Sequence, residues 1–345
     1  MMTSRCPLAR LTVIAVAALA PLPAAGQTMP RTSWGDPDLQ GTYTNKTITP
    51  LQRPTGLAAQ EFLTREETAD LEQATVDQNR RLLNRPARRT AVTESVDRGE
   101  DGAPGFYNNF WIDRGTTSTG RTSLIVDPPD GRIPPLTSAA QRREDARAEM
   151  RRARGPADVW TDLDLNDRCM LWSAGPPMVP TGYNNNYLFL QTPDHVVIHV
   201  EMIHDTRIIP LDGRPRLGAP IPQWLGEMRG RWEGETLVVE TTRMTRTDEG
   251  SAFGNDPIRM RAANGGTTQL QVVERFTRVD ANTIRYEFTV EDPSRWQRPW
   301  SGVIPLRTAD GPLFEYACHE GNYGIANILS GERARERAAG AGDLR

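Results

Sequence analysis

The sequence has few of the residues that usually carry out catalysis. Its 345 residues include four histidines, three cysteines and a single lysine, Lys46. One lysine gives little support for Schiff-base catalysis, which needs a reactive amine. The sequence also has no G-x-G-x-x-G motif after a strand, no P-loop and no G-x-S-x-G elbow. These absences argue against the common nucleotide-binding folds and the α/β-hydrolase type of enzyme.

An excess of charge of one sign is also missing. The 41 basic and 44 acidic residues give a formal net charge of −3. This balance excludes a nucleic-acid-binding surface that depends on net charge, so we expect a small-molecule partner and no nucleic acid. After residue 22 no stretch approaches the roughly 18 apolar residues that a membrane-spanning helix needs. We therefore expect no integral membrane segment in the mature protein.

The N-terminus has the pattern of a secretory signal peptide. Arg5 and Arg10 precede an apolar stretch over 11–22, and Ala24-Ala25-Gly26 offers small residues for cleavage. This pattern predicts removal of residues 1–26 and a periplasmic or secreted protein. Cys6 leaves with the signal peptide, so Cys169 and Cys318 become the only thiols in an oxidising compartment. We expect a disulfide between them; two separate buried thiols are the alternative.

The remaining chain contains many short elements separated by turns. The 29 glycines and 27 prolines favour a β fold over a helical bundle. Residues 27–160 predict a short strand at 41–43, a helix over 65–84, a strand at 122–126 and a helix over 139–153 capped by Ser138 and Gln141. Strands are expected at 187–191, 195–203, 206–210, 230–233, 236–242, 269–278, 283–290, 301–307 and 313–318.

A meander of this kind must close or curl to protect its edges. We therefore predict a mainly β protein with an antiparallel lipocalin-like barrel at 161–330; a two-sheet β-sandwich is the alternative. Residues 27–160 form an extended and helical segment that wraps the barrel, and 331–345 form a charged tail.

Three longer phrases show a resemblance. They are TSLIVDPPDG at 122–131, RGRWEGETLVVET at 229–241 and EYACHE at 315–320. Over about residues 31–330 the chain resembles a widespread family of exported bacterial proteins of uncharacterised function. The resemblance implies export and a single composite unit. The resemblance implies no established activity and assigns no catalytic residue in this chain.

The histidines are concentrated near one predicted strand. His195, His199 and His204 fall within ten residues, and His319 follows Cys318. If 195–207 were one regular strand, alternation would place one polar set on a single face: His195, Val197, His199, Glu201, Ile203, Asp205 and Arg207. A bulge near residues 204–205 would bring His204 to the same face. Such a face lines a reactive pocket if it turns inward. If it turns outward, it is an ordinary solvent-exposed strand face.

The predicted catalytic set is built around His204. His204 transfers a proton, Asp205 or Glu201 orients it or acts as the base, and Arg207 stabilises negative charge. His319 lies near the end of the strand that carries Cys318 and completes the set. If the disulfide forms, it brings Asn184–Asn186 within reach of this strand.

Substrate contacts are expected from Tyr323, Asn185, Tyr183 and His199. Aromatic rings together with side-chain amides can bind polyols, sugars or phenolic rings. The segments 107–111 and 183–187 both combine aromatic residues with asparagines. The alternative is that asparagines occupy turns and that aromatic side chains fill barrel ends.

No cofactor motif is present, and we expect none. The spacing H-x-E-x-x-H at 199–204 differs from the helical zinc motif, so a metal remains only a weak alternative.

The sequence thus predicts an exported barrel enzyme that performs acid–base chemistry on a small cyclic or hydroxylated molecule, as an isomerase, lyase or hydrolase. Two other readings share the fold. One is a non-catalytic carrier of a small ligand, and the other is a structural envelope protein.

Residues 27–160 should not fold by themselves. Their two helices have narrow apolar stripes, so they cannot bury enough surface alone to offset chain entropy. We expect a fragment that begins at Thr161 to lose cooperative unfolding in a urea titration followed by fluorescence. A fragment that unfolds as cooperatively as the mature chain would contradict this prediction.

Overall fold

The computed structural model describes residues 29–57, 59–84, 112–113, 115–153, 157–163, 165–172, 175–218, 221, 223–244 and 269–342. The expected signal peptide and the aromatic segment 107–111 lie outside these residues. Ten strands form one antiparallel sheet with the order β5-β4-β3-β1-β10-β9-β8-β7-β6, and β2 pairs with β10. The strands are β1 Gly41–Thr44, β2 Ile125–Asp127, β3 Asn186–Gln191, β4 His195–Val200, β5 Thr206–Pro210, β6 Glu227–Glu233, β7 Thr236–Thr242, β8 Gln271–Arg278, β9 Thr283–Glu291 and β10 Trp300–Thr308.

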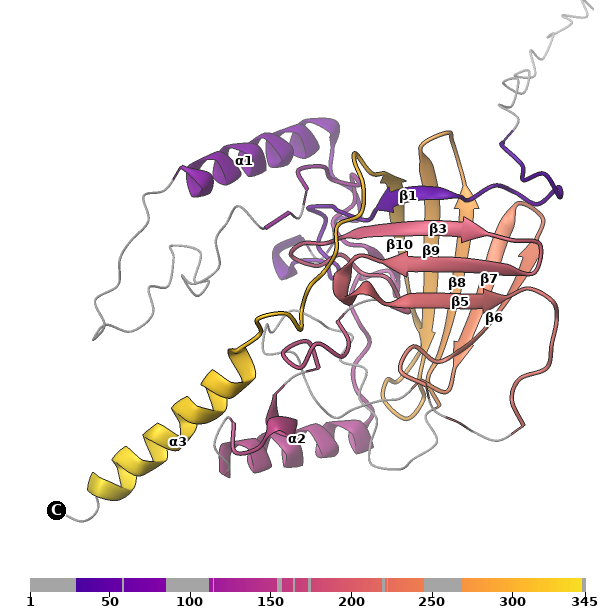
Figure 1. Cartoon of the computed structure of the whole chain (residues 1–345). Helices are drawn as coiled ribbons and strands as arrows, with labels where there is room; N and C mark the ends of the chain where they lie inside the picture. The colour runs from indigo at the N-terminus through magenta and orange to yellow at the C-terminus, as the bar shows by residue number, and fades with distance from the viewer. Residues whose placement is uncertain are drawn as a thin grey trace, which may run out of the picture.

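The sheet curls into a nearly closed barrel, which confirms the predicted mainly β barrel. In Figure 1, β3, β4 and β5 run across the front while β8, β9 and β10 stand behind them. β1 joins the two groups, because Tyr43 pairs with Tyr187 of β3 and with Thr308 of β10. The strand near the N-terminus is therefore an internal part of the sheet.

The two ends of the sheet, β5 and β6, meet at a seam that side chains fill. Among the described residues the strand order gives no backbone pairing between these two strands, although they lie in contact. A Cβ atom at Gly230 of β6 would lie 2.8 Å from Cγ2 of Ile209 and 2.6 Å from Cδ2 of Leu211. Only glycine therefore leaves room for these two side chains at the seam.

The barrel interior is built by alternation along the strands. In β9 the even-numbered residues Ile284, Tyr286, Phe288 and Val290 are buried, while Arg285 and Glu291 are exposed. Seven buried aromatic rings follow one another through the interior, with neighbouring centroids 4.9 to 5.8 Å apart: Tyr43, Phe189, Phe276, Tyr286, Phe288, Trp300 and Trp296. These rings fill the interior and supply much of the apolar area that stabilises the barrel.

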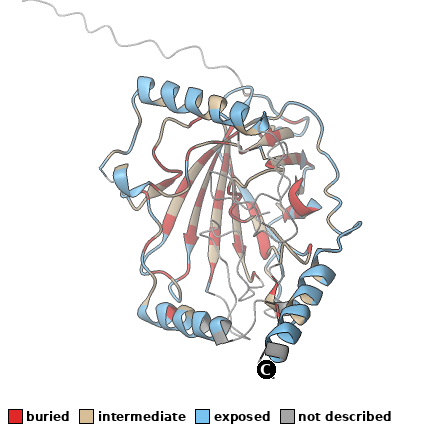
Figure 2. Cartoon of the chain, turned by 90° about the vertical axis from the view of Figure 1, so that its left-hand side faces the viewer, coloured by how far each residue is buried: buried red, intermediate tan, exposed pale blue. Residues whose placement is uncertain are grey.

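The helices lie outside the barrel and are mostly exposed (Figure 2). They are α1 Arg65–Leu83, α2 Ser138–Ala153 and α3 Gly324–Gly342, with short 3₁₀ turns η1 Thr55–Leu57, η3 Trp160–Asp162 and η4 Met202–His204. Thr64 and Glu67 form the predicted capping box of α1. α2 is held to the β9–β10 loop by polar contacts, including an ion pair of 3.1 Å between Glu144 and Arg295.

Three of the sequence predictions need correction. The strand expected at 195–203 ends at Val200, because the chain turns at Glu201. No strand forms at 313–318, where the chain crosses other elements without pairing to a strand. The cap of α2 is Thr137, whose hydroxyl accepts a hydrogen bond of 3.1 Å from the backbone N–H of Ala140.

Candidate functional site

The predicted polar strand is a hairpin with a tight turn at residues 201–205. The backbone N–H of Val200 donates to the carbonyl of Asp205 at 2.8 Å, which closes the turn. β4 and β5 then pair antiparallel, with His199 opposite Thr206 and Ile198 opposite Arg207. The expectation that His195, His199 and Arg207 share one face is therefore wrong. Reversal of the chain places Arg207 in the interior, while the two histidines are on the outer side of β4.

Glu201 opens the turn and joins it to two other segments. Its side chain is buried, and its two carboxylate oxygens accept separate hydrogen bonds. Asn186 Nδ2 donates to Oε2 at 2.6 Å, and the backbone N–H of Phe314 donates to Oε1 at 3.2 Å. Since a buried carboxylate is costly unless it is hydrogen-bonded, these contacts fix Glu201 in place. Glu201 is thus better suited to hold segments together than to act as the base.

A strap, residues 309–323 between β10 and α3, passes this turn and is fixed a second time by a disulfide. Cys318 of the strap is bonded to Cys169, as the sequence predicts. Asn322 Nδ2 donates to Sγ of Cys169 at 3.3 Å. In Figure 1 the strap runs past the η4 end of the β4–β5 hairpin toward α3.

Four segments therefore meet at this end of the hairpin. We call them the hairpin-end cluster: the turn 201–205, residues 184–186, Cys169 and the strap. The structure describes five non-glycine residues with positive φ, and four belong to this cluster: Cys169 at 55°, Asn184 at 51°, Ile203 at 58° and His204 at 50°. Ile203 is β-branched, so the left-handed conformation is unfavourable for it. Backbone strain of this kind tends to accumulate at functional sites.

His204 and Asp205 combine an exposed imidazole with a half-buried carboxyl group. Oδ2 of Asp205 is buried and has no hydrogen-bond partner within the described part of the chain. Burial raises the pKa of Asp205 from 3.8 to about 6, and the adjacent His204 opposes this shift. A carboxyl group with a pKa near neutrality can both accept and release a proton at physiological pH. His204 is exposed to solvent.

Arg207 belongs to a separate polar group inside the barrel. It forms a fully buried bidentate ion pair with Glu274 of β8. Tyr286 donates to Glu274 Oε1 at 2.8 Å and accepts from the backbone N–H of Met178 at 2.9 Å. Burial, and next the Glu274 carboxylate, raise the pKa of Tyr286 well above its ordinary value. The predicted role of Arg207 beside His204 is not supported, because its guanidinium faces Glu274.

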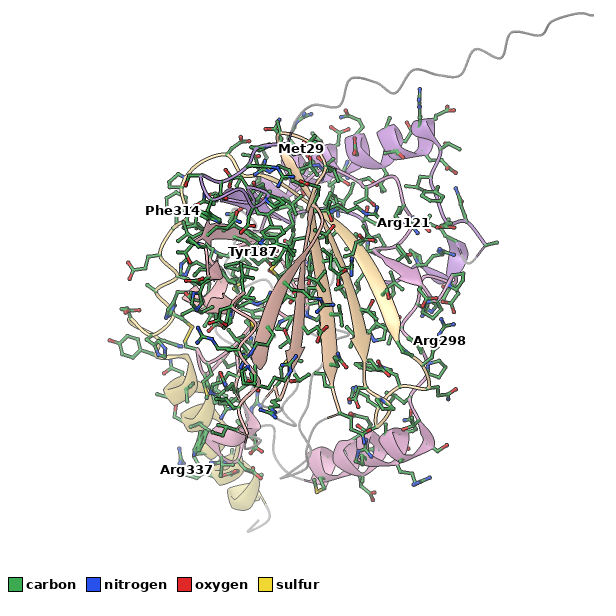
Figure 3. All side chains as sticks on the ribbon, turned by 90° about the vertical axis from the view of Figure 1, so that its right-hand side faces the viewer. Met29, Arg121, Tyr187, Arg298, Phe314 and Arg337 are labelled. Atoms are coloured by element: carbon green, nitrogen blue, oxygen red, sulfur yellow. A yellow bond between two sulfur atoms is a disulfide. The ribbon has the colours of Figure 1, made fainter. Side chains whose placement is uncertain are left out.

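The same interior holds two further polar residues, Tyr187 and Asn45, which were not among the predicted site residues. Tyr187 of β3 is buried, and its hydroxyl accepts a hydrogen bond of 2.9 Å from Nδ2 of Asn45. Burial raises the pKa of Tyr187 above the ordinary tyrosine value. Figure 3 shows Tyr187 among the side chains of the sheet, whereas Phe314 lies at the periphery. Glu274 could have been suspected, because it occupies the inward position between Val272 and Phe276 in an otherwise apolar alternation.

Of the other predicted residues, Asn185, His319 and Tyr323 belong to the hairpin-end cluster, whereas Tyr183 and His199 lie just outside it. Asn185 is buried and closes its own loop, accepting from the backbone N–H of Thr181 at 2.7 Å. Tyr183 packs edge-on against Trp172, with ring centroids 5.2 Å apart. His199 Nδ1 lies 2.8 Å from the hydroxyl of Thr206.

His319 and Tyr323 are exposed on the strap, on either side of Asn322. The disulfide thus ties the strap to Cys169, but Arg207 and Tyr323 do not share an environment. Arg207 is 1% exposed and Tyr323 is 73% exposed.

The structure gives no positive indication of a metal site. Among the residues that it describes, no three histidine, cysteine, aspartate or glutamate side chains gather in a group that could hold a metal ion. At the H-x-E-x-x-H sequence, Glu201 already accepts two hydrogen bonds and His199 lies on the outer side of β4. The expectation of no cofactor stays a prediction.

Comparison with known proteins does not assign the chain to a family. No protein-family model, no curated protein and no solved structure matches the chain. The resemblance to exported bacterial proteins therefore stays a prediction. Within the described residues, no helix is long and apolar enough to cross a membrane.

The raised pKa of Asp205 predicts a specific pH dependence of stability. A carboxyl group whose pKa rises on folding stabilises the folded state at low pH, and this contribution is lost as the pH rises from about 4 through 6. Because Asp205 is partly exposed, we expect Asp205→Asn to raise the free energy of unfolding by only about 1–2 kcal/mol at pH 7. The gain should disappear below pH 4.

Urea unfolding between pH 3.5 and 8 measures this difference. Asp310→Asn, at an exposed position of the strap, is the matched control and should follow the wild type. Parallel pH profiles for the wild type and Asp205→Asn would contradict the assignment of a desolvated carboxyl group.

Proposed function

We propose that this protein is an exported enzyme that performs general acid–base chemistry on a small cyclic or hydroxylated molecule, as an isomerase, lyase or hydrolase. The observation that carries the proposal is the pair His204–Asp205. A buried carboxylate oxygen that has no hydrogen-bond partner among the described residues adjoins an exposed imidazole, in a turn with two consecutive residues at positive φ. Such an arrangement lowers stability, and a catalytic role is a reason for a protein to keep it.

The proposed roles follow from the two environments. Asp205 takes a proton from the substrate, because its pKa of about 6 makes it a stronger base than an ordinary aspartate and leaves it mostly ionised at pH 7. His204 delivers a proton to the substrate or exchanges one with water. Glu201 is a positioning residue that holds the turn, Asn186 and the strap together.

Export supports the proposal from a separate direction. The N-terminal pattern predicts a signal peptide, and the bond between Cys169 and Cys318 fits an oxidising compartment. The disulfide fixes the strap covalently beside the turn. A periplasmic or secreted location is therefore part of the proposal.

A non-catalytic carrier is the second candidate, and one observation favours it. Three inward N–H donors have no hydrogen-bond partner within the described residues: Arg207 Nε, Trp232 Nε1 and Trp300 Nε1. A ligand with acceptor oxygens inside the barrel would satisfy such donors. The filled aromatic interior weighs against this candidate, since Trp300 and Tyr286 are 0% exposed. A structural envelope protein has no observation in its favour.

Substitution of His204 separates chemistry from packing. Because His204 is exposed, His204→Gln should leave the melting temperature nearly unchanged while turnover falls about 10²- to 10⁴-fold. His204→Gly should stabilise the fold by about 0.5–1 kcal/mol, since glycine adopts positive φ without strain, and should lose activity equally.

The assay begins with a thermal-shift screen of sugars, phenolics and lipophilic acids at several pH values, and turnover of each hit is followed by NMR. His195→Gln, on the outer side of β4, is the control and should keep full activity. A His204→Gln variant that melts much lower, with a wild type that responds to no ligand class, would favour the structural reading.

A further inference from the structure

Phe314 is a large apolar residue that the fold holds in solvent. Its side chain is 71% exposed, more than that of any other phenylalanine among the exposed large hydrophobic residues of the described chain. The strap around it is not loosely attached. Two residues later Tyr316 packs against the core, and Cys318 carries the disulfide. The exposure of Phe314 is therefore a result of how the strap is fixed.

The fixing contact is made by a buried charge. The backbone N–H of Phe314 donates to Oε1 of Glu201, whose side chain is buried. Glu201 Oε2 is held by Asn186 at 2.6 Å, so the acceptor cannot move with the strap. Burying a carboxylate has a large desolvation cost, which two hydrogen bonds offset only in part. If the strap only had to be attached to the barrel, burying the phenylalanine ring would do so without the cost of a buried carboxylate.

This contact brings the backbone of Phe314 to the turn that carries the proposed proton-transfer pair. Glu201 precedes His204 by three residues, and the carbonyl of Glu201 accepts a hydrogen bond of 3.3 Å from the backbone N–H of His204. Three residues span at most about 10 Å even when fully extended, and this turn is compact. An exposed phenyl ring and an exposed imidazole therefore stand at the same end of the hairpin.

We propose that Phe314 is the substrate-binding platform of this site and that the substrate carries an aromatic ring, such as that of a phenolic acid. The inference rests on the proposed function and names the substrate class. A ring stacked on Phe314 brings its substituents toward His204 and Asp205. Glu201 is the positioning residue that holds the platform, and Tyr316 anchors the strap by packing against the core.

The test measures binding of 4-hydroxybenzoate to the full mature protein by calorimetry, with cyclohexanecarboxylate as the non-aromatic counterpart. The wild type should prefer 4-hydroxybenzoate. Phe314→Ala should weaken this binding about 3- to 10-fold, the range expected for loss of one stacked ring pair. It should leave binding of cyclohexanecarboxylate nearly unchanged, and Phe314→Trp should restore aromatic binding.

Two controls separate the platform from general effects. Phe62→Ala removes another exposed phenylalanine, on the segment before α1, and should change neither ligand. The melting temperature of Phe314→Ala should match that of the wild type, since an exposed ring contributes little to folding. Glu201→Ala should weaken aromatic binding although the phenyl ring is still present.

Any of three results would overturn the inference. They are no preference of the wild type for the aromatic acid, no binding of either acid, or equal binding by Phe314→Ala and the wild type. Failure of the proposed function gives a different result. In that case Phe314→Ala weakens aromatic binding, but the turnover of each ligand is the same for His204→Gln and for the wild type.

Discussion

The ion pair between Arg207 and Glu274 is the interaction on which the rest of this structure depends. Arg207 belongs to β5, the first strand of the sheet path, and Glu274 belongs to β8, near its other end. β5 and β6 meet without backbone pairing in the described structure, so side chains must hold the barrel together at that seam. The buried pair does so across the interior, and Tyr286 adds a hydrogen bond to the same carboxylate. Such a pair contributes less to net stability than to selecting one arrangement of the strands.

The geometry of the hairpin-end cluster follows from this constraint. Arg207 lies two residues after Asp205, so its pairing to Glu274 fixes where β5 begins. β4 must then reverse within residues 201–205 to reach that position, and the chain accepts positive φ at Ile203 and His204. Glu201 and the strap are held from the other side by Asn186 and the disulfide. The strained turn is therefore held between two fixed points.

The sequence predicted the strands well and the polar contacts poorly. The expected bounds of β5 and β7 agree with the structure because turn residues flank short β-branched runs there. The disulfide was predictable from export and from the number of thiols. The absence of a strand at 313–318 was not predictable, because an apolar segment fixed by one carboxylate resembles a strand in composition. The pairing of Arg207 with Glu274 joins residues 67 positions apart, and no local pattern indicates which carboxylate faces which guanidinium.

Hydrogen exchange of residues 201–210 in matched variants tests the central role of the ion pair most directly. Arg207→Met and Glu274→Met each leave one charge buried without its partner, and each should lower the free energy of unfolding by about 3–5 kcal/mol. Both should also accelerate amide exchange in the turn and in β5. The double variant Arg207→Met/Glu274→Met leaves no unpaired buried charge, so it should recover most of the stability, but residues 201–210 should still exchange faster than in the wild type because the pair that fixes them is absent. Single variants that keep wild-type exchange in residues 201–210 would contradict the claim that this pair holds the hairpin in place.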